Sequence, residues 1–197
     1  MTINQNKRFT DKVAFITSAA GGIGKATVLA FAREGANIIL VDLDEIRLEE
    51  TVNLIEKIGQ HPLAITADVR NSKQIKNTVD RAVATFGHID LAFNNAGVEQ
   101  PVGPIGKVTE DDWYHYININ LNDVFLCMKY LIPVILRNVV DQSLILLPVQ
   151  ALLVLKGKLL MPRLNLALSI LPNVPHLIMQ NQTFGSMPFV LVLLTRQ

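Results

Sequence analysis

Apolar and polar residues alternate along residues 8–136 in a pattern that predicts buried strands separated by amphipathic helices. Short apolar runs predict strands covered on both faces, and apolar residues at helical spacing among charged ones predict helices. Because strands and helices alternate, we expect right-handed crossovers and a parallel α/β sheet. The predicted strands are Val13–Thr17, Asn37–Val41, Leu63–Ala67 and Ile89–Phe93, and the predicted helices are Ala26–Glu34, Glu45–Ile58, Ser72–Phe86 and a long helical region at Thr109–Leu136.

This pattern ends near Leu136. Residues 137–197 contain no glutamate, a single aspartate (Asp141) and many leucines, and five prolines interrupt them. No consistent strand or helix period is visible there, and only Leu144–Leu147 resembles a strand. We therefore expect a dinucleotide-binding domain at residues 8–136 and an irregular apolar tail at residues 137–197.

The apolar tail favours aggregation over a defined fold, because it is weakly charged and rich in leucine. A membrane hairpin is the less favoured alternative. Ser143–Leu155 is the longest nearly uncharged apolar stretch before Lys156. It is shorter than the roughly 20 residues that a spanning helix needs.

The whole-chain composition fits one soluble domain. A length of 197 residues can bury a real core, and a formal net charge of +1 gives no reason to expect a nucleic-acid partner. Cys127 is the single cysteine, which excludes an internal disulfide and fits a reducing compartment. The N-terminus has no apolar stretch behind its lysine and arginine, so we expect a cytoplasmic protein without a secretory signal. No metal site is predicted.

The glycine-rich residues 18–24 carry the first candidate chemistry, because they lie between the first strand and the first helix. A dinucleotide pyrophosphate binds backbone N–H groups at a helix N-terminus, and Gly22 and Gly24 would let the chain approach it closely. Asp42 ends the second strand about 20 residues further on, where a carboxylate accepts hydrogen bonds from the adenosine ribose and repels a 2′-phosphate. The combined spacing predicts NAD rather than NADP, and it outweighs the alternatives of an ordinary tight turn and a capping aspartate.

Four segments resemble, in order, the motifs of the short-chain dehydrogenase/reductase family. The resemblance covers roughly residues 8–136 and implies an incomplete Rossmann-like, doubly wound parallel sheet. It also implies NAD as cofactor, an alcohol or ketone as the substrate of intact relatives, and a homo-oligomer. The matching segments are Thr17–Gly24 (glycine motif), Ala67–Val69 (adenine contact), Asn94–Gly97 (signature after the fourth strand), and Asp112-Trp113 with Ile119–Leu121 and Val124-Phe125 (the helix of the catalytic asparagine).

The resemblance implies a role for each matching residue. Asn94 and Asn95 could otherwise be simple turn formers after a strand, an alternative that the neighbouring motifs weaken. Asn120 would bend its helix and hold a water in the proton relay. The cofactor residues implied are Ser18, Gly22, Ile23 and Gly24 for the pyrophosphate turn, Asp42 for the ribose, Asp68 and Val69 for adenine, and Asn94, Ala96 and Gly97 beneath the nicotinamide half.

Three departures from the family pattern change this expectation. Ser18 replaces a glycine where the backbone favours positive φ, and Asp123 brings a charge to a packed helix where the family commonly has glycine. In the family, a tyrosine acts as general acid/base with its pKa lowered by a lysine four residues later, while a serine orients the substrate. Here the last tyrosine after Asn120 is Tyr130, and Val134 stands four residues later. We therefore expect an oxidoreductase by descent that is catalytically inactive.

A change of reading frame is our hypothesis for the tail. Each codon of the alternative frame is rebuilt from the last base of one residue's codon and the first two bases of the next residue's codon. The three residue pairs of the tail that begin with methionine can then encode only alanine. With permitted codons elsewhere, one register turns Asp141–Pro148 into Ser-Ile-Val-Asn-Thr-Ser-Ser and Leu160–Asn165 into Tyr-Ala-Ala-Ser-Lys. The same register turns Gln182–Val192 into the strand and loop that usually follow. A one-step change between Leu136 and Val140 would thus replace the catalytic half. The alternatives are a non-catalytic NAD-binding or interaction protein, or a nonfunctional product.

Overall fold

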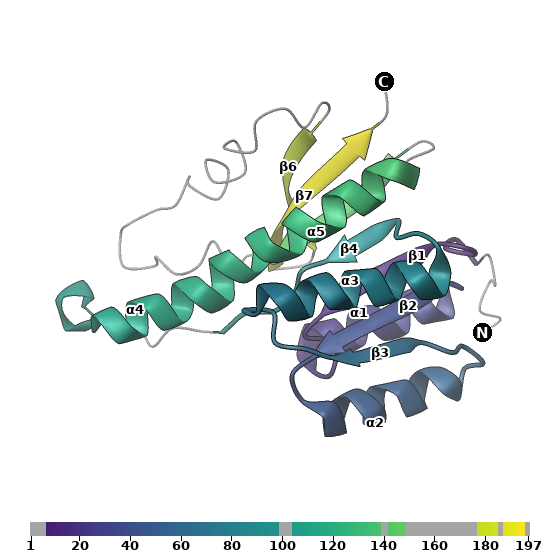
Figure 1. Cartoon of the computed structure of the whole chain (residues 1–197), viewed down its shortest axis with the longest axis horizontal. Helices are drawn as coiled ribbons and strands as arrows, with labels where there is room; N and C mark the ends of the chain where they lie inside the picture. Colours follow the sequence, from purple (N-terminus) through teal and green to yellow (C-terminus); the bar gives the residue numbers. More distant parts are fainter. Residues whose placement is uncertain (1–6, 99–103, 139–141, 149–176, 185–186, 196–197) are drawn as a thin grey trace.

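The computed structural model describes residues 7–98, 104–138, 142–148, 177–184 and 187–195. Its strands form one sheet in the order β3-β2-β1-β4-β5-β7-β6, with helices on both faces of the first strands (Figure 1). The strands are β1 (Val13–Thr17), β2 (Asn37–Asp42), β3 (Leu63–Thr66), β4 (Leu91–Phe93), β5 (Gln142–Pro148), β6 (Leu177–Phe184) and β7 (Met187–Thr195). The helices are α1 (Gly22–Arg33), α2 (Glu45–Glu56), α3 (Ser72–Phe86), α4 (Glu110–Ile117) and α5 (Asp123–Asn138), with a 3-10 turn at Ile105–Lys107 and a π-helical turn at Asn118–Asn122.

Strand β1 lies at the centre of the parallel part of the sheet and is buried along its whole length. It pairs in parallel with β2 on one side and β4 on the other. Its side chains alternate between two cores, as strand geometry requires. Phe15 packs in the core that α3 and α5 cover, and Ile16 packs in the core that α1 and α2 cover. The predicted Rossmann-like parallel sheet with flanking helices is confirmed.

Several predicted elements differ in detail. The first helix begins at Gly22 rather than Ala26, and the second ends at Glu56 rather than Ile58. The fourth strand begins at Leu91 rather than Ile89, because the Asp90 carboxylate accepts a hydrogen bond from the backbone N–H of Val13 at 2.8 Å and so occupies the edge of β1 just before β4 begins. The long helical region is divided by the π-helical turn into α4 and α5. Residues 110–137 are long and apolar enough to cross a membrane by length and composition alone. Leu131 and Ile135 of α5 are fully buried in the core of the described structure.

The tail contributes strands to the same sheet. Leu144–Leu147, the one strand-like stretch of the tail, lies within β5, which pairs in parallel with β4. β7 pairs antiparallel with β5, and β6 pairs antiparallel with β7. The sequence pattern predicts neither β6 nor β7.

Candidate functional site

The glycine turn lies at the carboxyl end of β1 and opens α1. Gly22 has φ +51°, in the left-handed region that favours glycine. A Cβ at Gly24 would lie 2.0 Å from the Ser18 carbonyl oxygen and 2.7 Å from Asn95 Nδ2. Only glycine therefore fits at position 24, and its absence of a side chain lets α1 start directly against the turn.

The N-terminus of α1 differs from those of the next three helices. Asp44, Asn71 and Thr109 cap α2, α3 and α4 with side-chain oxygens, whereas the N-cap of α1 is Gly21, which supplies none. A Cβ at Gly21 or Gly22 would meet nothing within 4 Å, so the space over this turn is open. Free N–H groups and the positive end of the helix dipole favour an anion at this place.

Asp42 ends β2 beside this turn. Its Oδ2 accepts a hydrogen bond from the backbone N–H of Ala20 at 2.8 Å, and its Oδ1 accepts one from the N–H of Asp44 at 3.1 Å. Both bonds fix the partly buried carboxylate at the rim of the glycine turn. A negative charge is thus held where a sugar hydroxyl would find an acceptor and a phosphate would meet repulsion.

The loop after β4 lies directly behind the glycine turn. The Thr17 hydroxyl accepts hydrogen bonds from the backbone N–H groups of Asn95 at 2.9 Å and Ala96 at 3.0 Å. Asn95 Nδ2 donates to the Ser18 carbonyl at 3.3 Å. Asn94 is fully buried, and neither polar atom of its amide has a hydrogen-bond partner in the described structure. This loop is therefore held rigidly against the turn from β1, and it keeps one unsatisfied amide.

Asn120 lies in the π-helical turn and holds the end of the same loop. Its Oδ1 accepts from the N–H of Val98 at 2.8 Å, and its Nδ2 donates to the Val98 carbonyl at 2.9 Å. A π-helical turn is an irregularity of the kind that recurs at functional sites. The structure thus places Asn120 against Val98 at the end of the loop, where its amide fixes the loop backbone.

Asp68 and Val69 follow β3 on the other side of Asp42. Val69 is half-buried against the core. The Asp68 carboxylate forms an ion pair with Arg70, with Nη2 at 2.6 Å from Oδ2, and the pKa of Asp68 is lowered chiefly by hydrogen bonds from the Arg70 side chain. The candidate residues of the cofactor site therefore gather at the carboxyl ends of β1 to β4, where open α/β sheets bind ligands.

Known proteins share this arrangement. The profile described as short chain dehydrogenase matches residues 12–142. This chain belongs to the short-chain dehydrogenase family. It is 41% identical over 131 residues to the oxidoreductase YxbG of Bacillus subtilis, which covers 66% of this chain and 48% of the relative. It is 37% identical over 131 residues to the cyclohexanol dehydrogenase of an Acinetobacter strain, covering 66% and 52%.

Solved structures agree with this assignment. An NAD+-bound xylitol dehydrogenase superposes with a TM-score of 0.64 at 32% identity, and the match covers 66% of this chain and 50% of that chain. The chain therefore spans about half the length of the relatives that it matches. The matched part contains the glycine turn and Asn120, so the parallel sheet and its flanking helices are shared with short-chain dehydrogenases.

Both departures from the family's glycines have structural consequences. Ser18 adopts φ +50°, the left-handed conformation that a Cβ disfavours. Asp123 is fully buried at the start of α5, where its Oδ1 accepts from the N–H of Val124 and its Oδ2 has no partner among the described residues. Burial raises the pKa of Asp123 from 3.8 to about 8. The carboxyl group is therefore mostly protonated near neutral pH.

The sequence does not predict the roles of two residues at this site. Thr17 belongs to the glycine motif, but the motif does not indicate that its hydroxyl joins β1 to the loop after β4. Arg70 lies outside all four motifs. The signal for Arg70 was an opposite charge two residues after an aspartate at a strand end, a spacing that short turns allow but do not require.

Proposed function

We propose that this chain binds NAD through residues 8–136, and that it descends from short-chain dehydrogenases that oxidise alcohols or reduce ketones but does not itself transfer hydride. The open, uncapped start of α1 beside the fixed carboxylate of Asp42 carries the proposal. The cyclohexanol dehydrogenase and the NAD+-bound xylitol dehydrogenase among its relatives support an NAD-dependent ancestor acting on a small alcohol.

The residues of the turn fit the dinucleotide. The first backbone N–H groups of α1 at Gly22 and Ile23 would hold the pyrophosphate, and Asp42 would accept from the adenosine ribose. Ala96 and Gly97 would lie beneath the nicotinamide half. Bound NAD supplies the hydride acceptor, whereas the residues of this chain bind and orient it. NADP would bring about two further negative charges toward Asp42, which the carboxylate opposes.

Calorimetric titration with NAD and NADP tests the binding half of the proposal. We expect NAD to bind at least about tenfold more tightly than NADP, since hydrogen bonds to a charged group contribute about 1.5–3 kcal/mol. Asp42→Asn should weaken NAD binding and bring the affinities for NAD and NADP closer together. Asp44→Asn is the matched control, because it removes a neighbouring carboxylate but keeps a good helix cap, and it should leave the ratio unchanged. Equal ratios in all three proteins would refute NAD selection by Asp42.

The proposed inactivity follows from what hydride transfer requires of the protein. Hydride transfer to or from a carbinol carbon requires a group that takes or gives the hydroxyl proton. Tyr130 does not meet this need, because its hydroxyl is hydrogen-bonded at 2.7 Å to Ser72 Oγ at the start of α3. In addition, valine (Val134) rather than lysine stands four residues later. Incubation of the purified chain with NAD and a panel of secondary alcohols should give no NADH. Robust NADH formation would overturn the proposed inactivity.

The reading-frame hypothesis accounts for the missing proton-transfer pair and has its own test. The gene should be sequenced across the codons for Leu136–Val140 and through the tail. We expect one alternative frame to encode the serine and the Tyr-x-x-x-Lys pair without a stop. Stops or unrelated residues in that frame would refute the hypothesis, whatever the result of the NAD titration.

A non-catalytic interaction protein is the second candidate, and one observation favours it. Tyr114 of α4 and Phe125 of α5 are large aromatic side chains that are more than half exposed. Exposed aromatics on neighbouring helices are typical of a surface that meets a partner, including a second copy of the chain. Sedimentation of the purified chain, together with calorimetric titration of NAD, separates the candidates. An NAD-binding monomer should sediment at the mass of one chain and release heat with NAD, whereas an assembly without NAD affinity should have a larger mass and give no heat.

A further inference from the structure

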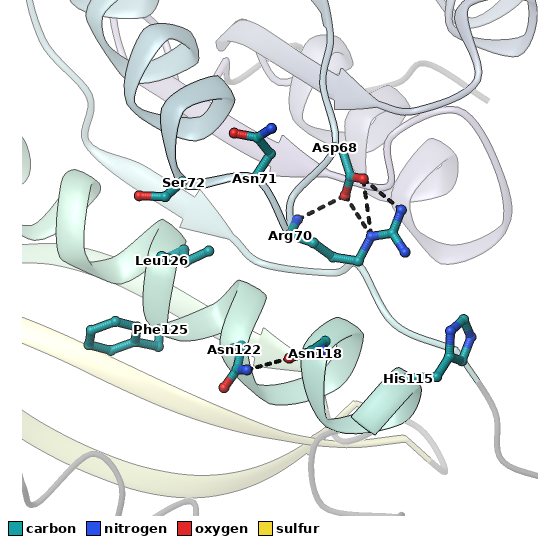
Figure 2. A pocket seen from close by; sticks show the side chains of 9 residues that line it. All are labelled: Asp68, Arg70, Asn71, Ser72, His115, Asn118, Asn122, Phe125 and Leu126. Carbon is teal, nitrogen blue, oxygen red and sulfur yellow. Dashed lines mark hydrogen bonds and ion pairs between the residues drawn. The ribbon is translucent and has the colours of Figure 1, made fainter. Parts of the chain in front are cut away.

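The connection between β3 and α3 carries an ion pair between Asp68 and Arg70. Arg70 turns back onto Asp68, away from Phe125 and Leu126 of α5 (Figure 2). Its backbone N–H donates to Asp68 Oδ1 at 2.9 Å, and its Nε donates to Oδ1 at 2.9 Å and Oδ2 at 3.1 Å. Its Nη2 donates to Oδ2 at 2.6 Å. One residue thus supplies three N–H donors to one carboxylate.

The backbone of Asp68 is fixed as well. Its N–H donates to Gln74 Oε1 at 2.7 Å, and its carbonyl accepts from the N–H of Asn71 at 2.9 Å. Main chain and side chain of Asp68 are therefore both held, and its side chain remains about a quarter exposed at the edge of an open cavity of about 790 Å³ between the start of α3 and the helices α4 and α5. Such a fixed acceptor is preorganised for a donor from a ligand.

The capacity of the carboxylate decides what it can still bind. An ionised carboxylate offers about four lone-pair sites. Arg70 brings three hydrogens to them, because Nε shares its one hydrogen between Oδ1 and Oδ2, so about one site is left. The Arg70 side chain also lowers the pKa of Asp68, so the group is ionised and acts only as an acceptor. The planar fork of the guanidinium fixes the orientation of the carboxylate, which a lysine ammonium would not do.

We propose that Arg70 is a positioning residue for adenine recognition, because it holds the Asp68 carboxylate in one orientation with capacity for the exocyclic amino group of the base. This inference rests on the proposed binding of NAD, and on the adenine contact that family resemblance assigns to Asp68. It adds that the selectivity for adenine depends on Arg70, which need not touch the cofactor.

The test compares NAD with nicotinamide hypoxanthine dinucleotide, which has a carbonyl oxygen in place of the adenine amino group. The wild-type chain should bind NAD at least about tenfold more tightly, because the analogue presents an acceptor to an ionised carboxylate. Arg70→Gln should reduce this ratio to within about threefold, mainly through weaker NAD binding. Arg70→Lys keeps the charge without the fork, and it should lower the ratio in the same direction.

Lys73→Gln is the matched control. Lys73 is exposed in the first turn of α3, two residues past the N-cap, and its removal takes away the same positive charge near the site. This variant should weaken the binding of both dinucleotides by one common factor, so the ratio of their affinities should stay unchanged. Far-UV circular dichroism identifies any variant that does not fold. If Arg70→Gln does not fold, the affinity ratio of Arg70→Lys is compared with that of the wild type instead.

The outcomes separate the inference from the proposed function. A ratio that collapses in the Arg70 variants and persists in Lys73→Gln supports the positioning role. An Arg70→Gln variant that lowers both affinities equally, or that leaves the ratio at the wild-type value, overturns the positioning role while NAD binding stands. A wild-type chain that binds neither dinucleotide overturns the proposed function, and the positioning role with it.

Discussion

Asp123→Asn should stabilise this protein, by an amount that grows as the pH rises. The Asp123 side chain is fully buried at the start of α5, and one of its oxygens has no partner among the described residues. Burial raises its pKa in the folded protein to about 8, against an ordinary value of 3.8. Below the lower value the carboxyl is protonated in both the folded and the unfolded chain, so it costs nothing by ionisation. As pH rises toward 8, the unfolded chain ionises and the folded chain does not.

The size of the effect follows from this pKa difference. Each pH unit between the two values costs the folded state about 1.4 kcal/mol, so the free energy of unfolding falls by about 6 kcal/mol from about pH 4 to about pH 8. Small domains are stable by about 5–15 kcal/mol in total, so this one side chain removes a large share. Asparagine has nearly the same shape, but its amide carries two N–H donors where the protonated acid carries one O–H. The variant should therefore lie within about 1–3 kcal/mol of the wild type near pH 4, and it should exceed the wild type by several kcal/mol near pH 8.

Urea unfolding followed by far-UV circular dichroism at several pH values between these limits measures the difference. Asp111→Asn is the matched control, since Asp111 is an exposed carboxylate in the first turn of α4. Its removal should change the free energy of unfolding by a few tenths of a kcal/mol at every pH. If the free energies of unfolding of the wild type and Asp123→Asn changed with pH in parallel, the reasoning would be refuted.

Two further substitutions test the site and its supports. Ser18→Gly removes the strain of a side chain at φ +50°, so it should raise the free energy of unfolding by about 1 kcal/mol and tighten NAD binding. Asp11→Gly is the control, because Asp11 has φ +61° but is remote from the glycine turn. It should raise the free energy of unfolding without changing NAD binding. A Ser18→Gly protein with a lower urea midpoint would contradict this. Tyr130→Phe removes the hydrogen bond to Ser72 and should cost about 1 kcal/mol in urea unfolding while leaving the calorimetric affinity for NAD unchanged. Loss of NAD binding would mean that Tyr130 belongs to the site.

Much of the parallel sheet can be predicted from the sequence, because its strands are short apolar runs buried on both faces. Val13–Thr17 is buried at every position and was predicted with the bounds that the structure gives. The placement of the candidate residues at one edge of the sheet follows from the same pattern, since the carboxyl ends of parallel strands meet there. The strain at Ser18 and the burial of Asp123 were also expected, because each replaces a family glycine at a known place.

Other features depend on contacts between distant residues and leave no local pattern. The π-helical turn forms where the Asn120 amide bonds the backbone of Val98, and helical periodicity alone does not reveal such a contact. The hydrogen bond from the N–H of Ala20 to Asp42 joins the glycine turn after β1 to the end of β2. The antiparallel pairing of β6 and β7 follows no residue period that the tail displays.

The central claim is that the glycine turn holds NAD, and calorimetry of Gly24→Ala beside the wild type tests it most directly. A Cβ at position 24 would lie 2.0 Å from the Ser18 carbonyl and must displace α1 from the turn, whereas Gly106→Ala meets nothing within 4 Å and serves as the control. The wild type and Gly106→Ala should show saturable one-site heats with NAD, and folded Gly24→Ala should show none. No heat with the wild type, or an unchanged affinity in Gly24→Ala, would contradict the claim.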